Sequence, residues 1–239
     1  MHTENSQKIT ESTNAINELA TKIGLEKNNK FDTTRSFLVA GLAGVPLIGG
    51  SLTSLIDDFI PTQKSKRLDC VINKISIDIE KISDKIKTDV INTDNFAYIF
   101  EKTLKGVMDN YQQEKIDCYR AILLNSLTND NNLSNEQQEI FLQLLDNLTV
   151  THVRIIAILF NNNSGDLIEV IQKSYSSLDI NNINYIMDDL RNKGLVHQKG
   201  QIGDNSLNTN FNQLSEMGKK FTNFIAFKSD KLDLRKTLI

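Results

Sequence analysis

Tryptophan is absent from this chain of 239 residues, and proline and cysteine occur only twice each. Two cysteines cannot build the disulfide framework of a small secreted domain, and Cys70 and Cys118 do not form a CxxC pair. We interpret both as buried free thiols in a reducing cytosol. The scarcity of proline suits long uninterrupted helices, because proline breaks the interior of a helix.

An excess of basic charge is also missing. The chain has 27 Lys and Arg residues against 30 Asp and Glu residues, which gives a formal net charge of -3. Proteins that coat nucleic acid usually carry a basic excess, so indiscriminate DNA or RNA binding is disfavoured. Charged residues make up 24% and hydrophobic residues 39% of the chain, which is typical of a globular protein with a buried core.

The usual motifs of catalysis and metal binding are lacking as well. No pair among His2, His152 and His197 has metal-ligand spacing, and no HExxH or GxSxG motif is present. We interpret His152, which follows Thr149 near an expected helix start, as a capping or core-edge histidine rather than a base. The sequence therefore predicts no enzymatic activity, no catalytic residue, no cofactor and no metal.

Two segments precede the expected helical region. Residues 1–35 form a polar leader with weak helical periodicity and charges of both signs, unlike a signal peptide. Residues 36–62 are rich in glycine, and no charge occurs from Ser36 to Ile56. The stretch Phe37–Ile56 is about as long as the roughly 20 residues that cross a bilayer, and membrane helices tolerate its glycines and Pro46.

Two interpretations of this apolar segment remain open. It forms a buried hairpin or glycine-rich element of the core, or it inserts into or touches a membrane. The candidate membrane residues are Phe37, Leu38, Val39, Leu42, Val45, Leu47, Ile48, Leu52, Leu55 and Ile56.

Residues 63–148 predict a bundle of long helices. A seam of apolar residues with heptad spacing runs through Arg67–Val90, and its members are Leu68, Ile72, Ile75, Ile79, Ile82 and Ile86. Either the seam packs inside this chain or it forms an intermolecular coiled coil; the first interpretation is favoured, because three heptads are the lower limit for the second. A further helix is expected over Asp94–Leu127, bent near Gly106, with Tyr111 on its apolar face.

The next helix is expected to begin at a capping box formed by Ser134 and Gln137. It would bury Ile140, Phe141, Leu144, Leu145 and Leu148.

After it, residues 149–228 predict three helices, a strand near Leu195–Gln198, a tip at Gly200–Asn205, a strand near Leu207–Gln213 and a final helix from Ser215. The first of these helices would bury Val153, Ile156, Leu159 and Phe160. This order is that of a winged helix-turn-helix, and a tail at 229–239 follows.

In a winged helix the third helix enters the major groove of DNA. Here the candidate partner or DNA face consists of Asn181, Asn182, Tyr185, Arg191 and Lys199. Over residues 179–193, three acids oppose two bases, so phosphates would meet a net charge of -1. Docking of a protein, or a purely structural role, is therefore favoured over reading DNA.

One block resembles a known family. Its helix carries an E-K-x-x-x-x-R-x-x-L-L pattern, and after a gap comes F-x-x-L-L-x-x-L-[TS]-x-x-H-x-x-I-x-x-L. These positions are Glu114, Lys115, Arg120, Leu123, Leu124, Phe141, Leu144, Leu145, Leu148, Thr149, His152, Ile155 and Leu159. Over about residues 38–160 the chain resembles the helical domain of the abortive-infection alpha (Abi-alpha) family. The resemblance implies phage defence and no catalytic residues, and that family does not require a winged-helix tail.

The sequence as a whole predicts a mainly α protein, a multi-helix bundle followed by a winged helix-turn-helix-like domain with a small β-hairpin. We expect a non-enzymatic bacterial or phage-related interaction protein in the cytoplasm, with membrane association through residues 37–56 left open. Its partner would be another protein or a second copy of itself. The alternative is a DNA-binding transcriptional regulator.

Overall fold

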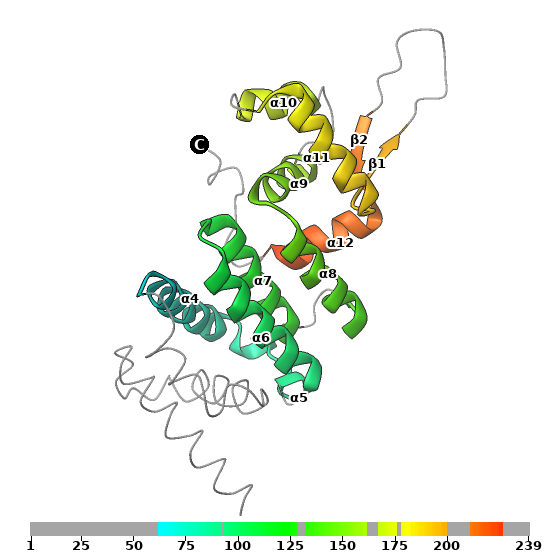
Figure 1. The fold of residues 1–239 in the computed structure, drawn as a ribbon. Coiled ribbons are helices and arrows are strands. Elements are labelled where there is room, and N and C mark those ends of the chain that lie inside the picture. The colour runs from blue at the N-terminus through cyan, green and yellow to red at the C-terminus, as the bar shows by residue number, and fades with distance from the viewer. Residues whose placement is uncertain are drawn as a thin grey trace, which may run out of the picture. The chain divides into compact units, whose positions relative to one another are not determined.

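A computed structural model describes residues 62–91, 93–128, 132–161, 167–175, 178–199 and 211–226 (Figure 1). The predicted leader at 1–35, the apolar stretch at 37–56, the tip at 200–205 and the tail at 229–239 lie outside these residues. Within the described ranges the protein is mainly helical with a two-stranded antiparallel sheet, as predicted. The chain divides into two compact units, with the boundary between Leu142 and Gln143.

The elements follow one another in a simple order. The first unit contains α4 (Thr62–Lys81), the short 3₁₀-helix η1 (Ser83–Lys85), α5 (Thr88–Ile91), α6 (Asp94–Asp109), α7 (Gln113–Thr128) and α8 (Asn135–Asn147), whose last turn crosses the boundary. The second unit contains α9 (Val150–Asn161), α10 (Leu167–Ser174), α11 (Ile180–Asn192), β1 (Val196–Lys199), β2 (Phe211–Leu214) and α12 (Glu216–Ile225).

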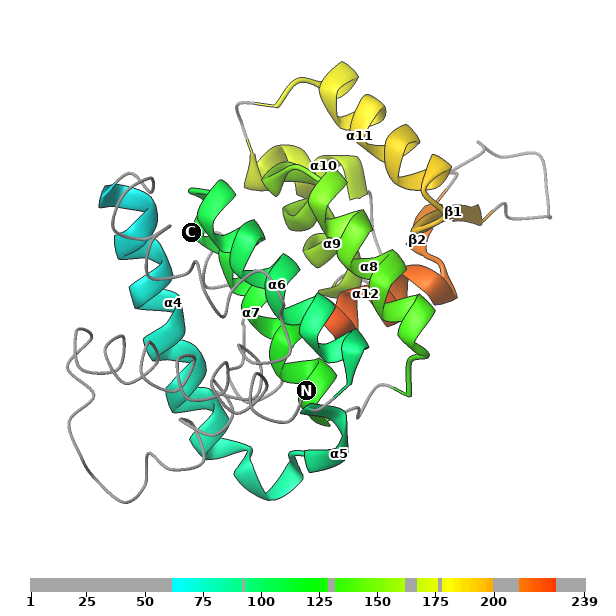
Figure 2. The same ribbon diagram turned by 60° about the horizontal axis from the view of Figure 1, so that its bottom comes forward.

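The apolar seam of α4 packs inside the chain. Its members Leu68, Ile72, Ile75, Ile79 and Ile82 are buried, and α4 lies against α6 and α7, which also pack on each other (Figure 2). The expected helix to Val90 is nevertheless wrong, because α4 ends at Lys81 and the backbone at Ile86 is extended. Ser83 and Asp84, which are weak helix formers, begin the 3₁₀-helix at this break.

The single helix expected over Asp94–Leu127 is two helices. Thr93 caps α6, since its Oγ1 accepts from the N–H of Phe96 at 3.2 Å. The helix ends where the Asn110 amide donates to the carbonyl oxygen of Gly106 at 2.8 Å. Tyr111 lies in the connection and is 77% exposed, so its placement on the buried face is wrong.

Gly106 has a packing role rather than the expected bend. A Cβ atom at this position would lie 2.4 Å from the ring of Tyr119. The absence of a side chain therefore lets α6 approach α7 at this ring. Helix α7 is buried along nearly its whole length, and that includes the polar residues Lys115, Arg120 and Asn125.

The predicted capping box begins α8. The N–H of Ser134 donates to Oε1 of Gln137 at 3.1 Å, and the N–H of Gln137 donates to Oγ of Ser134 at 3.3 Å. Leu145 of α8 and Ile156 of α9 are buried as expected.

Two large residues on these helices were assigned wrongly. Ile140 is 46% exposed and Phe160 is 41% exposed. Each lies about 100° around its helix from a buried neighbour, Phe141 or Leu159. Periodicity located most of each buried face, but it included these two residues and omitted Leu142 and Ile158, which are buried.

The small sheet follows α11 through a tight turn. Gly194 has a φ of 73°, its N–H donates to the Arg191 carbonyl at 2.8 Å, and the N–H of Leu195 donates to the Leu190 carbonyl at 3.0 Å. These two bonds make a Schellman C-cap, which uses glycine because a Cβ is unfavourable at positive φ. The strands are antiparallel with Val196 opposite Leu214. Each ends one residue later than predicted, and the predicted start of the second strand at 207–210 lies outside the described residues.

Candidate functional site

Helix α11 carries most of the predicted partner face, and both of its ends are capped. Oδ1 of Asp179 accepts from the N–H of Asn182 at 2.8 Å, which makes Asp179 the N-cap of α11. The Gly194 turn closes the other end. The helix buries Ile183, Ile186, Met187 and Leu190 against the second unit.

The opposite side of α11 is open. Asn181, Asn182 and Tyr185 are exposed as predicted, and the Tyr185 side chain is 71% exposed. The amide of Asn182 is partly used, since its Nδ2 donates to Oδ2 of Asp179 at 3.0 Å. Asn181 and Tyr185, one turn apart, therefore form the centre of the outward surface, and Asn184 extends it.

Arg191 has a different position from the one expected. Its Nη1 donates to Oδ1 of Asn212 on β2 at 3.0 Å, and its Nη2 pairs with Asp188. The guanidinium thus ties α11 to the sheet, and sequence reasoning missed Asn212 because it lies 21 residues away. Lys199 ends β1 opposite Phe211, and its side chain lies outside the described part of the structure.

Both cations of α11 lie in ion pairs with acids of the same helix. Lys193 Nζ is 2.7 Å from Oδ1 of Asp189, and Arg191 pairs with Asp188. A phosphate approaching this helix would have to displace a carboxylate from each cation. The electrostatics of α11 therefore resemble those of a neutral protein surface more than those of a DNA-reading helix.

His152 caps α9, in keeping with the sequence interpretation. The N–H of His152 donates to Oγ1 of Thr149 at 3.4 Å, and Nδ1 of His152 accepts from the N–H of Thr149 at 3.3 Å. This is the reciprocal pattern of a capping box, with an imidazole in place of the usual Glu or Gln. Oγ1 of Thr149 also lies 2.6 Å from Nδ1.

The other edge of the same ring faces α11. Nε2 of His152 lies 3.1 Å from Oδ2 of Asp189, and the pair does not have the angles of a hydrogen bond. Thr149, His152 and Asp189 are residue types that nucleophilic catalysis uses. Here the hydroxyl and the imidazole hold the start of α9, and the carboxylate is shared with Lys193.

The turn after α11 is fixed by α12. Oγ of Ser215 accepts from the N–H of Gly218 at 2.9 Å and donates to the Gly194 carbonyl at 2.6 Å. A Cβ at Gly218 would lie only 2.1 Å from the Leu195 carbonyl oxygen. The sequence Leu214-Ser215-x-x-Gly218 therefore has a physical role: the serine caps α12, and the glycine lets α12 contact the backbone of the turn.

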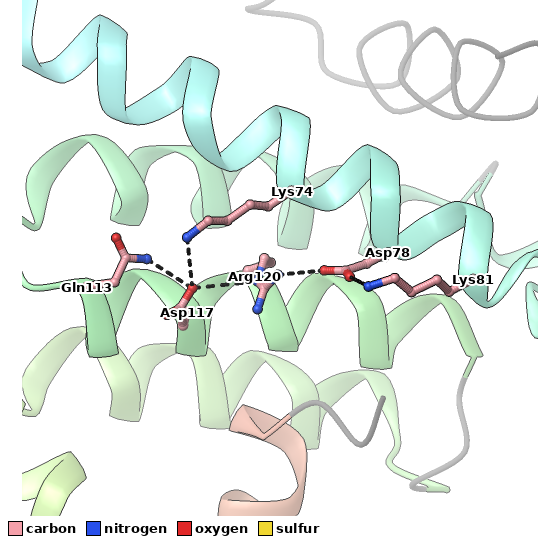
Figure 3. Close-up of polar contacts among 6 residues, drawn as sticks. All are labelled: Lys74, Asp78, Lys81, Gln113, Asp117 and Arg120. Carbon is pink, nitrogen blue, oxygen red and sulfur yellow. Dashed lines mark hydrogen bonds and ion pairs between the residues drawn. The ribbon is translucent and has the colours of Figure 1, made fainter. Parts of the chain in front are cut away.

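A second cluster of charged side chains joins α4 to α7, and sequence reasoning did not find it (Figure 3). Nη1 of Arg120 donates to Oδ2 of Asp78 at 2.7 Å, and both side chains are buried. Nζ of Lys81 lies 3.2 Å from the other oxygen of Asp78. The sequence offered one signal, since Asp78 directly precedes Ile79 and so lies at the flank of the buried seam.

The same cluster continues along α7. Oδ1 of Asp117 lies 3.6 Å from Nε of Arg120 and 4.0 Å from Nζ of Lys74, and it accepts from Nε2 of Gln113 at 3.0 Å (Figure 3). Acids and bases thus alternate within the cluster and neutralise one another. This arrangement holds two helices together.

The two cysteines differ, and the interpretation of both as buried is wrong for one. Cys118 is buried, and burial, with a smaller contribution from the charge of Asp117, raises the pKa of its thiol to about 12. Cys70 is exposed on α4. Heptad spacing placed Leu68 and Ile72 inward, and Cys70 lies between them on the other side of the helix.

Among the described residues, no group of three or more His, Cys, Asp or Glu side chains is arranged to hold a metal ion. In the same ranges no single helix is long and apolar enough to cross a membrane. Helices α8 and α9 taken together have the length and the apolar composition of a membrane span, but the chain bends sharply at the break between them.

Comparison with known proteins adds no relative. No protein-family model, no curated protein and no solved structure matches this chain. The resemblance to Abi-alpha proteins therefore stays a prediction from the sequence.

Proposed function

We propose that this chain is a non-enzymatic interaction protein whose second unit is a winged-helix-like domain that docks a protein partner through the outward face of α11. The observation that carries this proposal is the pairing of Arg191 with Asp188 and of Lys193 with Asp189 beside an exposed Tyr185. Tyrosine is enriched at protein interfaces, because its ring adds contact area and its hydroxyl accepts or donates a hydrogen bond.

The chemistry of this face defines the kind of partner. Asn181 and Asn184 offer amide donors and acceptors beside Tyr185, and the one acid on this stripe, Asp188, is paired. The matching surface is a protein surface with hydrogen-bonding groups around a pocket that accepts an aromatic ring. The caps at both ends of α11 hold the face in place before binding, which lowers the entropy cost of association.

The cellular setting of the proposal is phage defence of the abortive-infection type, and it rests on the sequence resemblance alone. The protein would stay in the cytoplasm until activated, and residues 37–56 would then reach the membrane. Single cysteines replacing Leu42, Leu47 and Leu52, in a chain lacking Cys70 and Cys118, test this step by labelling with a water-soluble thiol reagent. Labelling that liposomes suppress supports it, and rapid labelling that lipid does not change contradicts it, because the segment would then be exposed to water without entering the membrane.

A DNA-binding regulator is the second candidate. Asparagine side chains on the third helix of a winged helix can read adenine edges, and Asn181, Asn182 and Asn184 are all exposed. The two candidates predict different neighbours for the Tyr185 side chain, which is a protein in the first case and a nucleic acid in the second.

A photo-crosslinking amino acid in place of Tyr185 separates the candidates in living cells. Tyr111 provides a matched control, since it is 77% exposed and lies on the first unit. We expect a discrete protein adduct from position 185 that position 111 does not give and that Asn181→Arg weakens. A nucleic-acid adduct at 185, or sequence-specific nanomolar DNA binding lost in Tyr185→Ala, would instead establish the regulator.

A further inference from the structure

Four residues form the row of α11 that points most directly away from its buried side. They are Asn181, Tyr185, Asp188 and Asn192, and all four are exposed. They are spaced by four, three and four residues, so they lie on one line along the helix. The buried residues of α11 occupy the opposite side, which leaves this outer row open to a partner.

The spacing of the outer row reads the same in both directions along the helix. An antiparallel pairing with α11 of a second copy therefore brings all four residues into register at once. Asn181 would face Asn192 of the second copy, and Tyr185 would face Asp188. The two-fold symmetry of such a pair repeats each contact, as in most homodimers.

The groups that face each other in this pairing are chemically complementary. An amide both donates and accepts hydrogen bonds, so Asn181 and Asn192 can bond to each other. The hydroxyl of Tyr185 can donate to the carboxylate of Asp188, and a hydrogen bond to a charged acceptor is stronger than a neutral one. The ion pair with Arg191 is made by Oδ1 of Asp188, which leaves Oδ2 for the tyrosine.

The charge on the outer row also permits two copies to meet. Its one ionised side chain, Asp188, is paired with Arg191 of the same helix, so the row has no net charge to repel an identical row. A strongly charged partner would find no opposite charge here, whereas a second copy supplies a matching group at every position.

We propose that α11 forms an antiparallel, two-fold contact with α11 of a second copy of this chain through the outer row. The proposal rests on the docking face of the proposed function and names its occupant. A pair of 13-residue helices buries much less than the roughly 1,200 Å² of a stable interface, so the contact is weak and reversible.

Disulfide trapping tests both the partner and the direction of the helices. The full-length variants Asn181→Cys and Asn192→Cys are made in a Cys70→Ser background, because Cys70 is exposed whereas Cys118 is buried. Mixed in a glutathione redox buffer, the two variants should join at least about tenfold faster than either joins to itself, because the facing thiols have a high effective concentration. Position 181 lies about 16 Å along the axis from its own copy, which is too far for a disulfide.

The controls measure random collision and dependence on the row. Lys220→Cys on α12 is exposed on the same unit and gives the collision rate. Adding Tyr185→Ala to both cysteine variants should lower the rate of the mixed disulfide to that of this control. A mixed disulfide no faster than the control, or a disulfide between two copies of position 181 that forms as fast as the mixed one, would overturn the proposal.

A second measurement keeps both asparagines in place. A photo-crosslinking amino acid at position 185 should join two copies of the chain, and peptide mapping should place the bond near Asp188. If the adducts from position 185 contain only a different protein, the pairing of two copies is wrong and the docking function stands. If they contain only nucleic acid, both fail.

Discussion

Two glycines inside helices touch their neighbours so closely that no side chain fits. Gly106 lies against the ring of Tyr119, which can rotate or shift by a small amount. Gly218 lies against the backbone carbonyl of Leu195, which is held by the N–H of Ser215 at 3.0 Å. The same substitution therefore has different consequences at the two sites, because side chains give way more readily than backbone.

Gly218→Ala should destabilise the protein by about 1–3 kcal/mol through overpacking. The sign of the change in the free energy of unfolding is informative, since alanine in an unobstructed helix interior would stabilise the protein by up to about 1 kcal/mol relative to glycine. Urea unfolding measures the difference. Lys220→Ala, exposed on the same helix, is the control and should change stability by less than about 0.5 kcal/mol. Equal or greater stability of Gly218→Ala would contradict the close contact.

The raised pKa of Cys118 predicts a loss of stability at alkaline pH. The unfolded thiol loses its proton near pH 9.0, whereas the folded thiol keeps it until about pH 12. In this window unfolding releases a proton, so the free energy of unfolding falls as pH rises, by up to about 1.4 kcal/mol per pH unit. Urea unfolding of the unmodified protein and of Cys118→Ala, measured between about pH 8.5 and about pH 10.5, tests this. The free energy of unfolding should fall less steeply with pH in Cys118→Ala.

Thiol labelling provides the control for that experiment. A water-soluble disulfide reagent at neutral pH should modify Cys70 at once and Cys118 only after denaturant is added, because the thiolate is the reactive form. Rapid labelling of two thiols in the native protein would show that the core around Cys118 opens readily, and would remove the basis of the predicted pH dependence.

At the scale of the element, each helix is defined by a buried stripe and by its caps. Thr93, Ser134, Asp179 and Ser215 begin helices through side-chain oxygens that accept from backbone N–H groups. These contacts span three residues, so they were predictable at Ser134 and Asp179 from neighbouring sequence alone. The apolar stripe of a helix is buried only where another element packs on it, and the width of the buried face depends on how deeply the helix lies in the core.

Leu145→Ala on α8 and Ile156→Ala on α9 should each cost about 2–5 kcal/mol, because both side chains are almost completely buried, at 0% and 1% exposure. Thermal or urea unfolding of the two variants measures the cost. Ile140→Ala removes a large side chain from the same helix α8 at an exposed site and should cost much less. Similar losses at positions 140 and 145 would mean that the buried face of α8 is assigned incorrectly.

At the scale of the whole molecule, charge is nearly balanced both globally and locally. The net charge of -3 is accompanied by pairing of acids with bases on α11 and in the cluster around Arg120. A protein of this kind has little general attraction for phosphate backbones. On the proposed function, we therefore expect the partner to be recognised by shape and hydrogen bonding over a limited surface.

Retention on random-sequence DNA should accordingly be negligible at physiological salt, with a Kd weaker than about 10 µM. Asp188→Asn/Asp189→Asn releases Arg191 and Lys193 from their acids and raises the net charge of α11, so this variant should bind DNA measurably, in a salt-dependent way. Fluorescence anisotropy at two salt concentrations tests both statements. Tight binding by the unmodified protein, unaffected by the substitutions, would show that another surface reads DNA.

The structure also changes how the outward face of α11 should be mutated. A combined replacement of Asn182, Tyr185 and Arg191 with alanine looks harmless from the sequence, since all three lie off the buried face. In the structure Asn182 bonds the N-cap Asp179, and Arg191 bonds Asn212 on the sheet. Asn181 and Tyr185 are therefore the positions that probe binding with the least effect on the fold.

Local spacing by itself determined where most helices lie, where several begin and how α11 ends, because caps and heptad steps act over three to seven residues. Only the tertiary structure decided that the chain breaks at Asn110 and that Arg120 meets Asp78. Those outcomes depend on pairs up to 42 residues apart and on which stripe finds a partner. A sequence pattern shows that a charged residue lies beside a buried seam, but the opposite charge that makes its burial tolerable is supplied by another helix.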